Sequence, residues 1–208
     1  MIVLLGPPAS GKGTQGRLLA EALSLSYLST GRRLRAEVAD DTPRGRLAKK
    51  FLEKGQYVPD YLVVELINEW IGQVDRGWVL DGFPRTLPQA EELDRILAPE
   101  ESSLRSVLLH VDFSELEIRV VGRRECRECS WTGNVTEASE TGGTCPGCGG
   151  RLHRRFDDIP ENFRKRFKEF EGLTLPVASY YEKSGRLLKV CGLGNQGKVF
   201  ERLQSELM

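Results

Sequence analysis

Residues 6–14 read Gly-Pro-Pro-Ala-Ser-Gly-Lys-Gly-Thr, a glycine-rich stretch with a single lysine. Before it lies the apolar run Ile2–Leu5, which is too short for a helix and is typical of a buried parallel strand. After it, over residues 18–23, apolar side chains recur at helical spacing. The order of strand, glycine-rich loop and helix predicts a phosphate-binding loop (P-loop) at the end of a parallel strand.

The residues of this loop suit phosphate groups for physical reasons. Glycines let successive backbone N–H groups turn inward around anionic oxygens, and the start of a helix adds partial positive charge. We expect Lys12 to reach the β- and γ-phosphates of a nucleotide and the Thr14 hydroxyl to hold Mg²⁺. The general pattern places Ser or Thr directly after the lysine, whereas Gly13 intervenes here, so Thr14 opens the same helix one residue later.

Two other interpretations of the loop are weaker. The spacing Gly11-x-Gly13-x-x-Gly16 matches a dinucleotide-binding fingerprint. It starts well past the strand, however, and no acidic residue ends a second strand about 20 residues further on, so we reject it. The remaining alternative is a glycine-rich turn that binds nothing, which the agreement of lysine, glycines, strand and helix disfavours.

The composition limits the classes of protein to which the chain can belong. Its 208 residues are enough for one full core with small inserted modules. The 30 basic and 30 acidic side chains cancel, so no bulk charge draws the chain to nucleic acid or to a membrane. No apolar run reaches membrane-spanning length and no signal peptide precedes the first strand, so we expect a soluble, cytoplasmic protein.

Short β-rich runs alternate with helical patterns along the chain. This alternation predicts an α/β fold with a doubly wound, five-stranded parallel sheet that helices cover on both faces. Two segments, 30–59 and 123–158, interrupt the alternation and are expected to be excursions from the core. The expected strands are Ile2–Leu5, Leu25–Leu28, Trp78–Leu80, Val107–Val111 and Leu187–Val190, and the expected helices include Tyr61–Val74, Leu87–Leu97, Ser114–Arg124 and Asn162–Ser184.

Four of the five cysteines form two closely spaced pairs. Cys126-x2-Cys129 and Cys145-x2-Cys148 are separated by fifteen residues, a spacing typical of zinc sites. Four thiolates close a tetrahedral shell, so we expect a structural Zn²⁺ rather than a catalytic one. Such a site can contribute roughly 10–16 kcal/mol of apparent binding energy to the folding of a segment with almost no apolar core. Cys191 stands in an apolar run and is expected to be a packing residue.

Further motifs along nearly the whole chain give it a family resemblance. They are residues 6–15, Ser29-Thr30-Gly31 with Arg35, Val58-Pro59-Asp60, Asp81-Gly82-Phe83-Pro84-Arg85-Thr86 with Gln89, Gly122-Arg123-Arg124, and Arg155-x-Asp157-Asp158-x-Pro160-Glu161 with Arg166. On these residues the chain resembles the adenylate kinases, which are nucleoside monophosphate kinases, and among them the long-lid, zinc-containing bacterial type. The resemblance implies three parts: a core (1–29, 60–122 and 159–208), a helical monophosphate-binding insert (30–59) and a zinc-bearing lid (123–158).

The resemblance also implies a role for each matching residue. The catalytic group would be Lys12, Asp81, Arg85, Arg123, Arg155 and Arg166. The ATP-binding residues would be Ala9, Ser10, Gly11, Lys12, Gly13, Thr14, Arg119, Arg123, Thr132, Gly133 and Gly194. The AMP-binding residues would be Thr30, Arg35, Gln56, Tyr57, Val58, Gly82, Phe83, Pro84, Arg85, Gln89, Arg155 and Arg166. Within the AMP-binding set, Gln89 would read the adenine edge.

These residue types fit phosphoryl transfer, which needs alignment and positive charge more than covalent help. Asp81 ends an expected strand, where its carboxylate can orient the waters of a Mg²⁺ ion held by substrate phosphates; the alternative role is a helix or turn cap. Arg85 follows a proline in a rigid context that suits a bidentate grip on the acceptor phosphate. A single such arginine can be worth about 10³–10⁵ in rate.

The resemblance implies reversible, Mg²⁺-dependent transfer of the γ-phosphoryl group of ATP to AMP, giving two ADP, by a monomer that binds no nucleic acid and no membrane. Arg32 stands in place of the family's usual acidic residue and reverses a charge beside the monophosphate site, which leaves another nucleoside monophosphate open as the acceptor. A hypothesis of another class is a nucleic-acid-binding zinc ribbon on a nucleotide-binding scaffold. Zero net charge and the lack of aromatic residues between the basic ones disfavour it.

Overall fold

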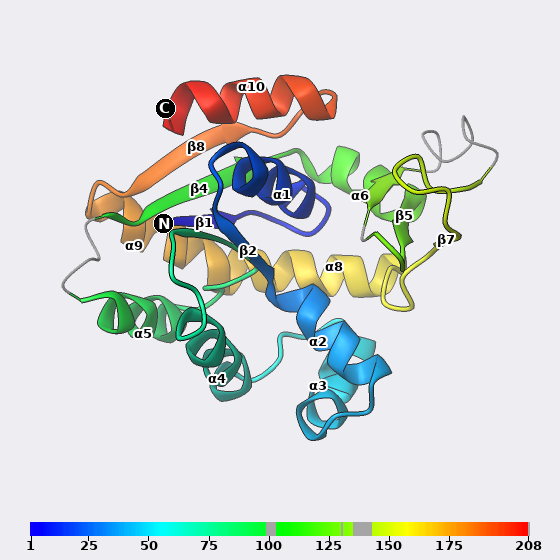
Figure 1. Ribbon diagram of the computed structural model, residues 1–208, viewed down its shortest axis with the longest axis horizontal. Coiled ribbons are helices and arrows are strands. Elements are labelled where there is room, and N and C mark those ends of the chain that lie inside the picture. The colour runs from blue at the N-terminus through cyan, green and yellow to red at the C-terminus, as the bar shows by residue number, and fades with distance from the viewer. Residues whose placement is uncertain (99–102, 130, 135–142, 208) are drawn as a thin grey trace.

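The structure, a computed structural model, describes residues 1–98, 103–129, 131–134 and 143–207. Within these ranges the main sheet has five parallel strands in the order β2-β3-β1-β4-β8 (Figure 1), which confirms the predicted fold class. The central strand, β1, pairs with β3 on one side and with β4 on the other. The strands are β1 (Ile2–Leu5), β2 (Ser26–Ser29), β3 (Trp78–Asp81), β4 (Arg105–His110) and β8 (Leu187–Cys191).

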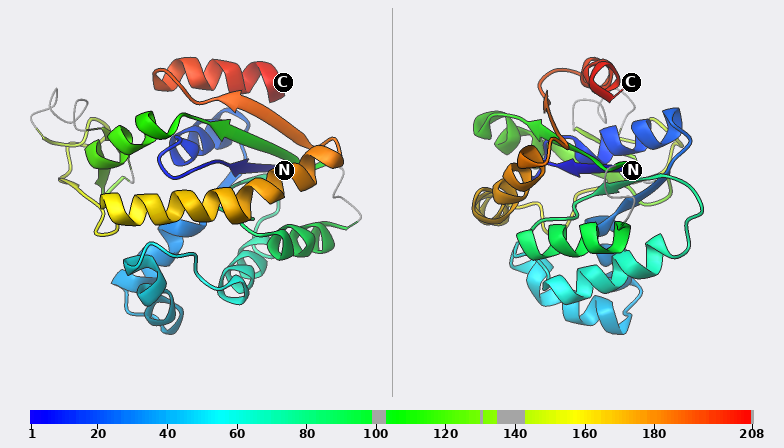
Figure 2. Two further views of the ribbon diagram at one scale, coloured as in Figure 1. Left: turned by 180° about the vertical axis from the view of Figure 1, so that it is seen from behind. Right: turned by 90° about the vertical axis from the view of Figure 1, so that its left-hand side faces the viewer.

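Helices cover both faces of this sheet (Figure 2). One face carries α1 (Lys12–Ala22) and α10 (Gln196–Leu207), and the other carries α4 (Asp60–Ile71), α5 (Leu87–Leu97) and α9 (Leu175–Lys183). In β1, Ile2 and Leu4 pack with the first group of helices, whereas Val3 and Leu5 pack with the second. A strand buried on two sides needs apolar residues at every position, which explains the uninterrupted apolar run. Among the described helices, none is both long and apolar enough to cross a membrane.

The segment after β2 forms two helices, α2 (Thr30–Ala39) and α3 (Pro43–Glu53), that lie to one side of the sheet (Figure 1). Thr42 caps α3, because its hydroxyl accepts a hydrogen bond from the backbone N–H of Gly45 at 3.0 Å. Gly45 also permits the close approach of the two helices. A Cβ at this position would lie 2.0 Å from the carbonyl oxygen of Glu37, so no other residue fits there without a shift of the backbone.

A second, antiparallel sheet follows α6 (Phe113–Gly122) and lies beyond one end of the main sheet (Figure 1). In the described part of this region its strands run in the order β6-β5-β7. They are β5 (Arg123–Cys126), β6 (Thr132–Asn134) and β7 (Leu152–His153). Of the described residues in 123–158, the buried apolar ones are Cys126 and Cys145, so this sheet has almost no aliphatic core. Residues 130 and 135–142 of the expected lid lie outside the described residues.

The segment that the sequence predicts as one helix, Asn162–Ser184, is divided in the structure. It consists of α8 (Pro160–Glu169), one wide turn of π-helix (Phe170–Thr174) and α9. In this turn the hydroxyl of Thr174 donates to the carbonyl oxygen of Arg85 at 3.0 Å and lies 3.1 Å from the hydroxyl of Tyr57. The wide turn therefore brings Thr174 to the segment that follows β3.

Candidate active site

A cavity of about 410 Å³ lies beyond the C-terminal ends of β1 and β3, where ligands of parallel sheets bind. One wall is the glycine-rich loop with the start of α1. A second wall comes from α2 and residues 56–58, and a third comes from β6 with the basic side chains near the second sheet. Three regions that are far apart in the sequence therefore share one cavity.

Most residues that the sequence predicts for nucleotide binding line this cavity. Of the ATP-binding set these are Ala9, Ser10, Gly11, Lys12, Gly13, Thr14, Arg119, Arg123, Thr132, Gly133 and Gly194, and of the AMP-binding set they are Thr30, Arg35, Gln56, Tyr57, Val58, Gly82, Pro84, Arg85, Gln89, Arg155 and Arg166. Asp81 also lies in the wall. The side chain of Phe83 is instead fully buried in the apolar core, because an aromatic ring gains more from burial there than from a polar wall.

The glycine-rich loop adopts a backbone shape that most side chains resist. Gly6 has φ +147°, and a Cβ there would lie 2.7 Å from the carbonyl oxygen of Leu109. Gly11, with φ +98°, directly precedes α1. Ala9 has φ +66°, a left-handed conformation that costs a non-glycine residue roughly 1–2 kcal/mol. This shape starts α1 at the cavity, so the unpaired N–H groups of its first turn are available to an anion.

The lysine of the loop is folded back onto the loop itself. Its Nζ donates to the carbonyl oxygens of Gly6 and Pro7, each at 2.7 Å. Burial lowers the pKa of Lys12 to about 8. The charge of Asp81 opposes this shift, and the charges of neighbouring arginines add to it. Carbonyl dipoles thus hold a lysine whose charge is not balanced by an acid in contact with it, and a phosphate would provide that balance.

The carboxylate of Asp81 stands beside this loop at the end of β3. The hydroxyl of Tyr27, on the neighbouring β2, lies 3.1 Å from Asp81 Oδ2 and 3.3 Å from the carbonyl oxygen of Gly13. Burial and the charge of Asp81 raise the pKa of Tyr27, so its hydroxyl stays a donor. Sequence reasoning missed Tyr27; the one available signal is its place in a strand adjacent to the strand that Asp81 ends.

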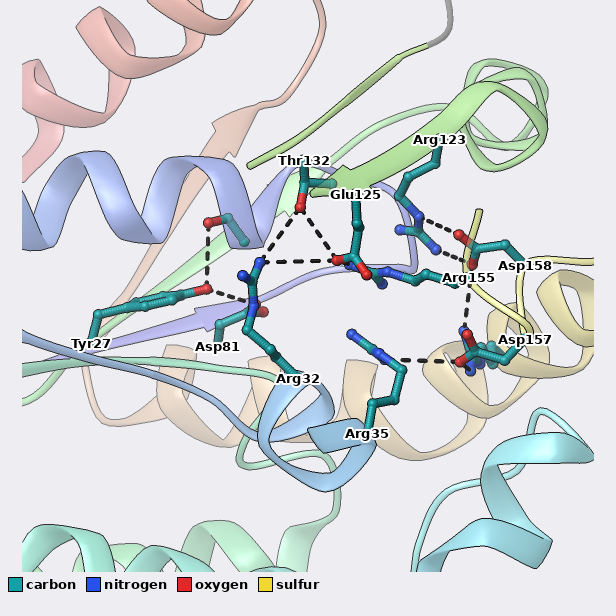
Figure 3. A network of polar contacts seen from close by, with 12 residues as sticks. Tyr27, Arg32, Arg35, Asp81, Arg123, Glu125, Thr132, Arg155, Asp157 and Asp158 are labelled. Atoms are coloured by element: carbon teal, nitrogen blue, oxygen red, sulfur yellow. Dashed lines mark hydrogen bonds and ion pairs between the residues drawn. The ribbon is translucent and has the colours of Figure 1, made fainter. Parts of the chain in front are cut away.

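Three arginines near the second sheet are each held by a carboxylate, and Figure 3 labels two of them, Arg123 and Arg155. Arg123 Nε donates to Asp158 Oδ2 at 2.7 Å, and its Nη2 pairs with the other oxygen of the same carboxylate. In the same way Arg155 pairs with Glu125, and Arg166 pairs with Asp157. The three arginine side chains are 13–14% exposed, so these pairs are largely shielded from water. Such arrangements fix guanidinium groups in orientations that a phosphate can use.

Glu125, which the sequence analysis did not single out, lies at the centre of this network (Figure 3). Burial would raise the pKa of its carboxyl, but the hydrogen bond and charge of Arg155, with the charges of Arg35 and Arg32, lower it to about 2. Arg32 Nη2 lies 3.9 Å from Glu125 Oε1 and 3.5 Å from the hydroxyl of Thr132. Glu125 therefore links α2 to the second sheet.

The cavity carries an excess of positive charge. Among the described residues its wall has eight basic side chains (Lys12, Arg32, Arg35, Arg85, Arg119, Arg123, Arg155 and Arg166) against two acidic ones (Asp81 and Glu115). Burial and the charge of Arg155 lower the pKa of Arg35, although Asp157 and Glu125 act in the opposite direction. Within the described structure the buried Nε of Arg155 has no hydrogen-bond partner. Anionic oxygens in the cavity would satisfy both groups.

At the insert side of the cavity, Arg85 is held by its neighbours. Its Nε donates to the carbonyl oxygen of Gly82 at 2.7 Å, and its guanidinium lies over the ring of Tyr57 at 4.7 Å from the ring centroid. The hydroxyl of Tyr57 is in turn 3.1 Å from that of Thr174. This stacking fixes the plane of the guanidinium, as two-pronged recognition of a phosphate requires.

The four cysteines predicted to bind zinc lie together. Their Sγ atoms are all within 4.8 Å of one another, with 3.5 Å between Cys126 and Cys148 and 3.4 Å between Cys129 and Cys145. Around a tetrahedral Zn²⁺ with bonds of about 2.3 Å, sulfur atoms would stand about 3.8 Å apart. The four sulfur atoms and their spacing therefore fit a structural Zn²⁺ bound by four thiolates. Such an ion would join the cysteine pair 126 and 129 to the cysteine pair 145 and 148.

Comparisons with known proteins agree with this geometry. The family model described as adenylate kinase matches residues 4–186. The chain is 39% identical over 211 residues to the adenylate kinase of Ruminiclostridium cellulolyticum, covering 99% of this chain and 98% of that one. It is 41% identical over 206 residues to that of Thermodesulfovibrio yellowstonii (97% and 96% covered), and 42% identical over 211 residues to that of a Geobacter species (100% and 97%). The chain therefore belongs to the adenylate kinase family of nucleoside monophosphate kinases.

Proposed function

We propose that the chain catalyses the reversible, Mg²⁺-dependent transfer of the γ-phosphoryl group of ATP to AMP, which gives two ADP. One observation carries the proposal: the loop lysine and arginines from three separate regions line the same cavity. In phosphoryl transfer, negative charge spreads over the equatorial oxygens of the transferred group, so converging cations stabilise the transition state. Membership in the family supports ATP and AMP as the two nucleotides.

We assign the phosphates of ATP to the glycine-rich loop. Lys12 would exchange its two carbonyl partners for β- and γ-phosphate oxygens, while backbone N–H groups of residues 9–14 surround them. Arg119 and Arg123 would contact the same phosphates from the lid side, and Thr132, Gly133 and Gly194 would contact the nucleotide further out. Thr14 and Asp81 would hold the Mg²⁺ that accompanies ATP, and this ion would neutralise part of the phosphate charge.

We assign AMP to the side of the cavity formed by the insert. Arg85 would bind its phosphate in a two-pronged manner, supported by the stacking on Tyr57, and Arg35 would share that phosphate from α2. Gln89 would face the base. Thr30, residues 56–58 and the backbone of residues 82–84 would line the rest of this site.

Transfer itself would depend on alignment, since the proposed mechanism needs no nucleophile from the protein. The acceptor phosphate of AMP is the nucleophile, and the arginines hold it in line with the γ-phosphorus. We assign Arg155 and Arg166 to the junction between the γ-phosphate of ATP and the phosphate of AMP. Both line the cavity, and each pairs with a carboxylate, Arg155 with Glu125 and Arg166 with Asp157. Phosphate oxygens would then take over hydrogen bonds that these carboxylates accept in the structure.

We further propose that the chain has three parts with separate roles in binding. The core (1–29, 60–122 and 159–208) would carry the loop, the insert (30–59) would carry AMP, and the lid (123–158) would bear Zn²⁺ and close over ATP. The four-cysteine cluster supports the zinc assignment. A single chain supplies all the residues that we assign to the two nucleotides, which supports a monomer as the working unit.

The test of the proposed function is ADP formation from MgATP with AMP, GMP, CMP or UMP as acceptor. We expect the highest kcat/KM with AMP. A higher value with another monophosphate would overturn the choice of acceptor, and no turnover with any of them would overturn the kinase assignment. Salt-dependent binding to DNA or RNA without turnover would instead favour the zinc-ribbon hypothesis. Arg32 contacts Glu125 and Thr132, so its position gives no reason to prefer a different base.

A further inference from the structure

Asp60 lies in the first turn of α4 and is not among the residues that line the cavity. We infer that it is a positioning residue for base selection: by fixing the orientation of the Gln89 carboxamide, it makes the monophosphate site accept a 6-aminopurine and reject a 6-oxopurine. This inference rests on the proposed function, in which Gln89 faces the base of AMP. It goes beyond that function because Asp60 acts on the nucleotide only through Gln89.

The side chain of Gln89 is held by two partners of opposite kind. Its Nε2 donates to Asp60 Oδ1 at 2.7 Å, and its Oε1 accepts from the backbone N–H of Arg85 at 2.7 Å. Gln89 lines the cavity and is only 2% exposed. Water therefore has little access to replace either partner, and both ends of the carboxamide depend on these two bonds.

A carboxamide with its two ends exchanged would fail at both positions. An ionised Asp60 can only accept hydrogen bonds, and the N–H of Arg85 can only donate. After the exchange, Gln89 Oε1 would face a carboxylate oxygen and its Nε2 would face an N–H group. An acceptor would then face an acceptor, and a donor would face a donor, in a buried site. Each of these groups would lose its hydrogen bond without gaining water, which costs its full desolvation free energy. The chemistry of the two neighbours thus sets the orientation of Gln89.

Asp60 is itself fixed by a second hydrogen bond. Its Oδ2 accepts from the hydroxyl of Thr86 at 2.7 Å. Thr86 is the N-cap of α5, and the same hydroxyl accepts from the backbone N–H of Gln89 at 3.3 Å. The first turn of α4 also favours a negative charge. Asp60, Thr86 and Gln89 therefore form a closed ring that joins the starts of two helices.

These contacts leave Gln89 with one N–H on Nε2 and one lone pair on Oε1 for a ligand. Adenine offers the complementary pair, because its N1 accepts and its 6-amino group donates. A 6-oxopurine offers the reverse, since its N1–H donates and its O6 accepts. A carboxamide free to turn would pair with either base, whereas a fixed one pairs with only one of them. With AMP as the proposed acceptor, the fixed orientation is the one that suits adenine.

The test compares AMP with inosine 5′-monophosphate (IMP), because their bases differ only in the groups at N1 and position 6. The quantity measured is the ratio of kcat/KM for AMP to that for IMP, with MgATP as donor. Asp60→Ala removes the acceptor, and we expect it to lower this ratio by about tenfold or more, mainly through a higher KM for AMP. Asp60→Asn keeps an acceptor oxygen but loses the charge that strengthens the bond, so we expect a fall of about threefold.

Two controls separate positioning from a merely structural role. Asp75→Ala changes an exposed acid beyond the end of α4 and is expected to leave the ratio unchanged. In a Gln89→Ala background there is no carboxamide to orient, so adding Asp60→Ala should change the ratio by less than about twofold, as expected for two residues that act through one contact. Thermal melting by circular dichroism reports folding. If Asp60→Ala does not fold, the ratio for Asp60→Asn decides.

An AMP-to-IMP ratio that both Asp60 variants leave unchanged would overturn the inference and leave the proposed function intact. The inference would also be overturned if Asp60→Ala lowered the AMP-to-IMP ratio equally in the native protein and in the Gln89→Ala background. Absence of AMP turnover by the native protein would overturn the proposed function, and this inference with it. The two failures are therefore distinguishable, because the second is seen before any variant is made.

Discussion

The two ends of the cavity hold their positive charges in different ways. At the loop end, Lys12 rests on the carbonyl oxygens of Gly6 and Pro7, and burial lowers its pKa to about 8. At the lid end, Arg155 faces Glu125, and against the effect of burial this pair lowers the pKa of Glu125 to about 2 (Figure 3). Among the described residues no acid pairs directly with the loop lysine, whereas the lid arginine is already paired with a carboxylate.

The structural support of the two ends differs as well. The loop grows from β1, which is buried on both faces of the main sheet. Among its described residues the second sheet has almost no aliphatic core, and four cysteine sulfurs lie close enough together to bind one metal ion. Apolar burial therefore stabilises one end, and metal coordination is expected to stabilise the other. A substitution or metal removal at one end of the cavity can therefore be compared with the unaltered other end.

Removal of the metal is expected to have the largest effect, and only at the lid end. A structural four-thiolate Zn²⁺ is worth roughly 10 kcal/mol or more of apparent binding energy, which the lid's own packing cannot replace. Chelation, or Cys126→Ser with Cys145→Ser, should abolish amide-exchange protection in β5 to β7. Hydrogen exchange resolved by peptide measures this, and peptides from β1 and β4 serve as the internal reference. Full protection of β5 in protein that mass spectrometry shows to be metal-free would contradict the account.

Loss of the loop charge is expected to remove most of the activity. Lys12→Met should lower kcat/KM for ATP plus AMP by about 10³-fold or more, because the γ-phosphoryl group loses a cation that stabilises its transition state. Folding should be retained, since within the described residues Lys12 contacts carbonyl oxygens of its own loop and forms no ion pair. Steady-state kinetics and thermal melting measure the two effects. Lys183→Met, an exposed lysine at the end of α9, is the matched control. A loss of less than about tenfold would contradict the role of Lys12.

Loss of the central carboxylate of the lid should reduce stability. Glu125→Gln removes the carboxylate that contacts the buried Arg155 and leaves only the more distant charges of the neighbouring aspartates. Breaking a buried ion pair in this way costs about 3–5 kcal/mol of unfolding free energy. Denaturant unfolding measures this cost. Glu117→Gln is the matched control, because Glu117 pairs at 2.9 Å with Arg164 at the surface, where such pairs are worth about 0–1 kcal/mol. Equal losses for the two variants would show that the Glu125 pair has no special role.

The same variant gives a pH test. The folded-state pKa of Glu125 is about 2, below its ordinary value of 4.5, so its stabilising contribution is fully present above pH 4.5 and is lost as the pH falls towards 2. The difference in unfolding free energy between the native protein and Glu125→Gln should therefore narrow as the pH falls through this window. Unfolding experiments from pH 6 down to the lowest pH at which both fold would measure it. A constant difference would contradict the assigned direction.

The smallest expected effect is the uptake of protons by Lys12 when a nucleotide binds. Because burial lowers the pKa of Lys12 to about 8, part of the Lys12 population is neutral at pH 8 before a nucleotide binds. A bound triphosphate favours the charged form, so binding of a non-hydrolysable ATP analogue at pH 8 should take up a fraction of a proton at Lys12. Isothermal titration in buffers with different ionisation enthalpies measures the uptake, which Lys12→Met should lack. Equal uptake by both proteins would contradict the pKa assigned to Lys12.

Much of the fold could be predicted because its signals are local. The apolar run of β1 is buried on both faces, and the glycine-rich loop adjoins it directly in the sequence. The predicted helix Asn162–Ser184 is divided by a π-helical turn, in which Thr174 contacts residues that are distant in the sequence. The helix α10 is absent from the expected helices, although Val199 and Leu203 on it are buried. The contacts of Thr174 leave no local signal in the sequence. Val199 and Leu203 do stand four positions apart, a helical spacing that the expected helices did not include.

In the candidate site, too, residues in local motifs could be predicted, whereas residues that act through long-range contacts could not. Most predicted wall residues lie in or beside short motifs, and the resemblance of these motifs to the adenylate kinase family supplied their expected roles. The missed residues act through long-range pairs: Tyr27 lies 54 positions from Asp81, and Glu125 lies 30 positions from Arg155. Asp60 belongs to a quoted motif, but its contact with Gln89, 29 positions away, was not expected. A charged residue directly before Cys126 was a signal for Glu125, but only the fold shows that an arginine faces it.

Transfer of the γ-phosphoryl group from one nucleotide to the other is the claim on which the account depends. It is tested most directly by incubating the purified protein with Mg²⁺, AMP and ATP labelled with ³²P at the γ-position, and locating the label. We expect the label to move to the β-phosphate of the ADP made from AMP, with two ADP formed for each ATP consumed. Label released as inorganic phosphate, or label that remains in ATP, would contradict it.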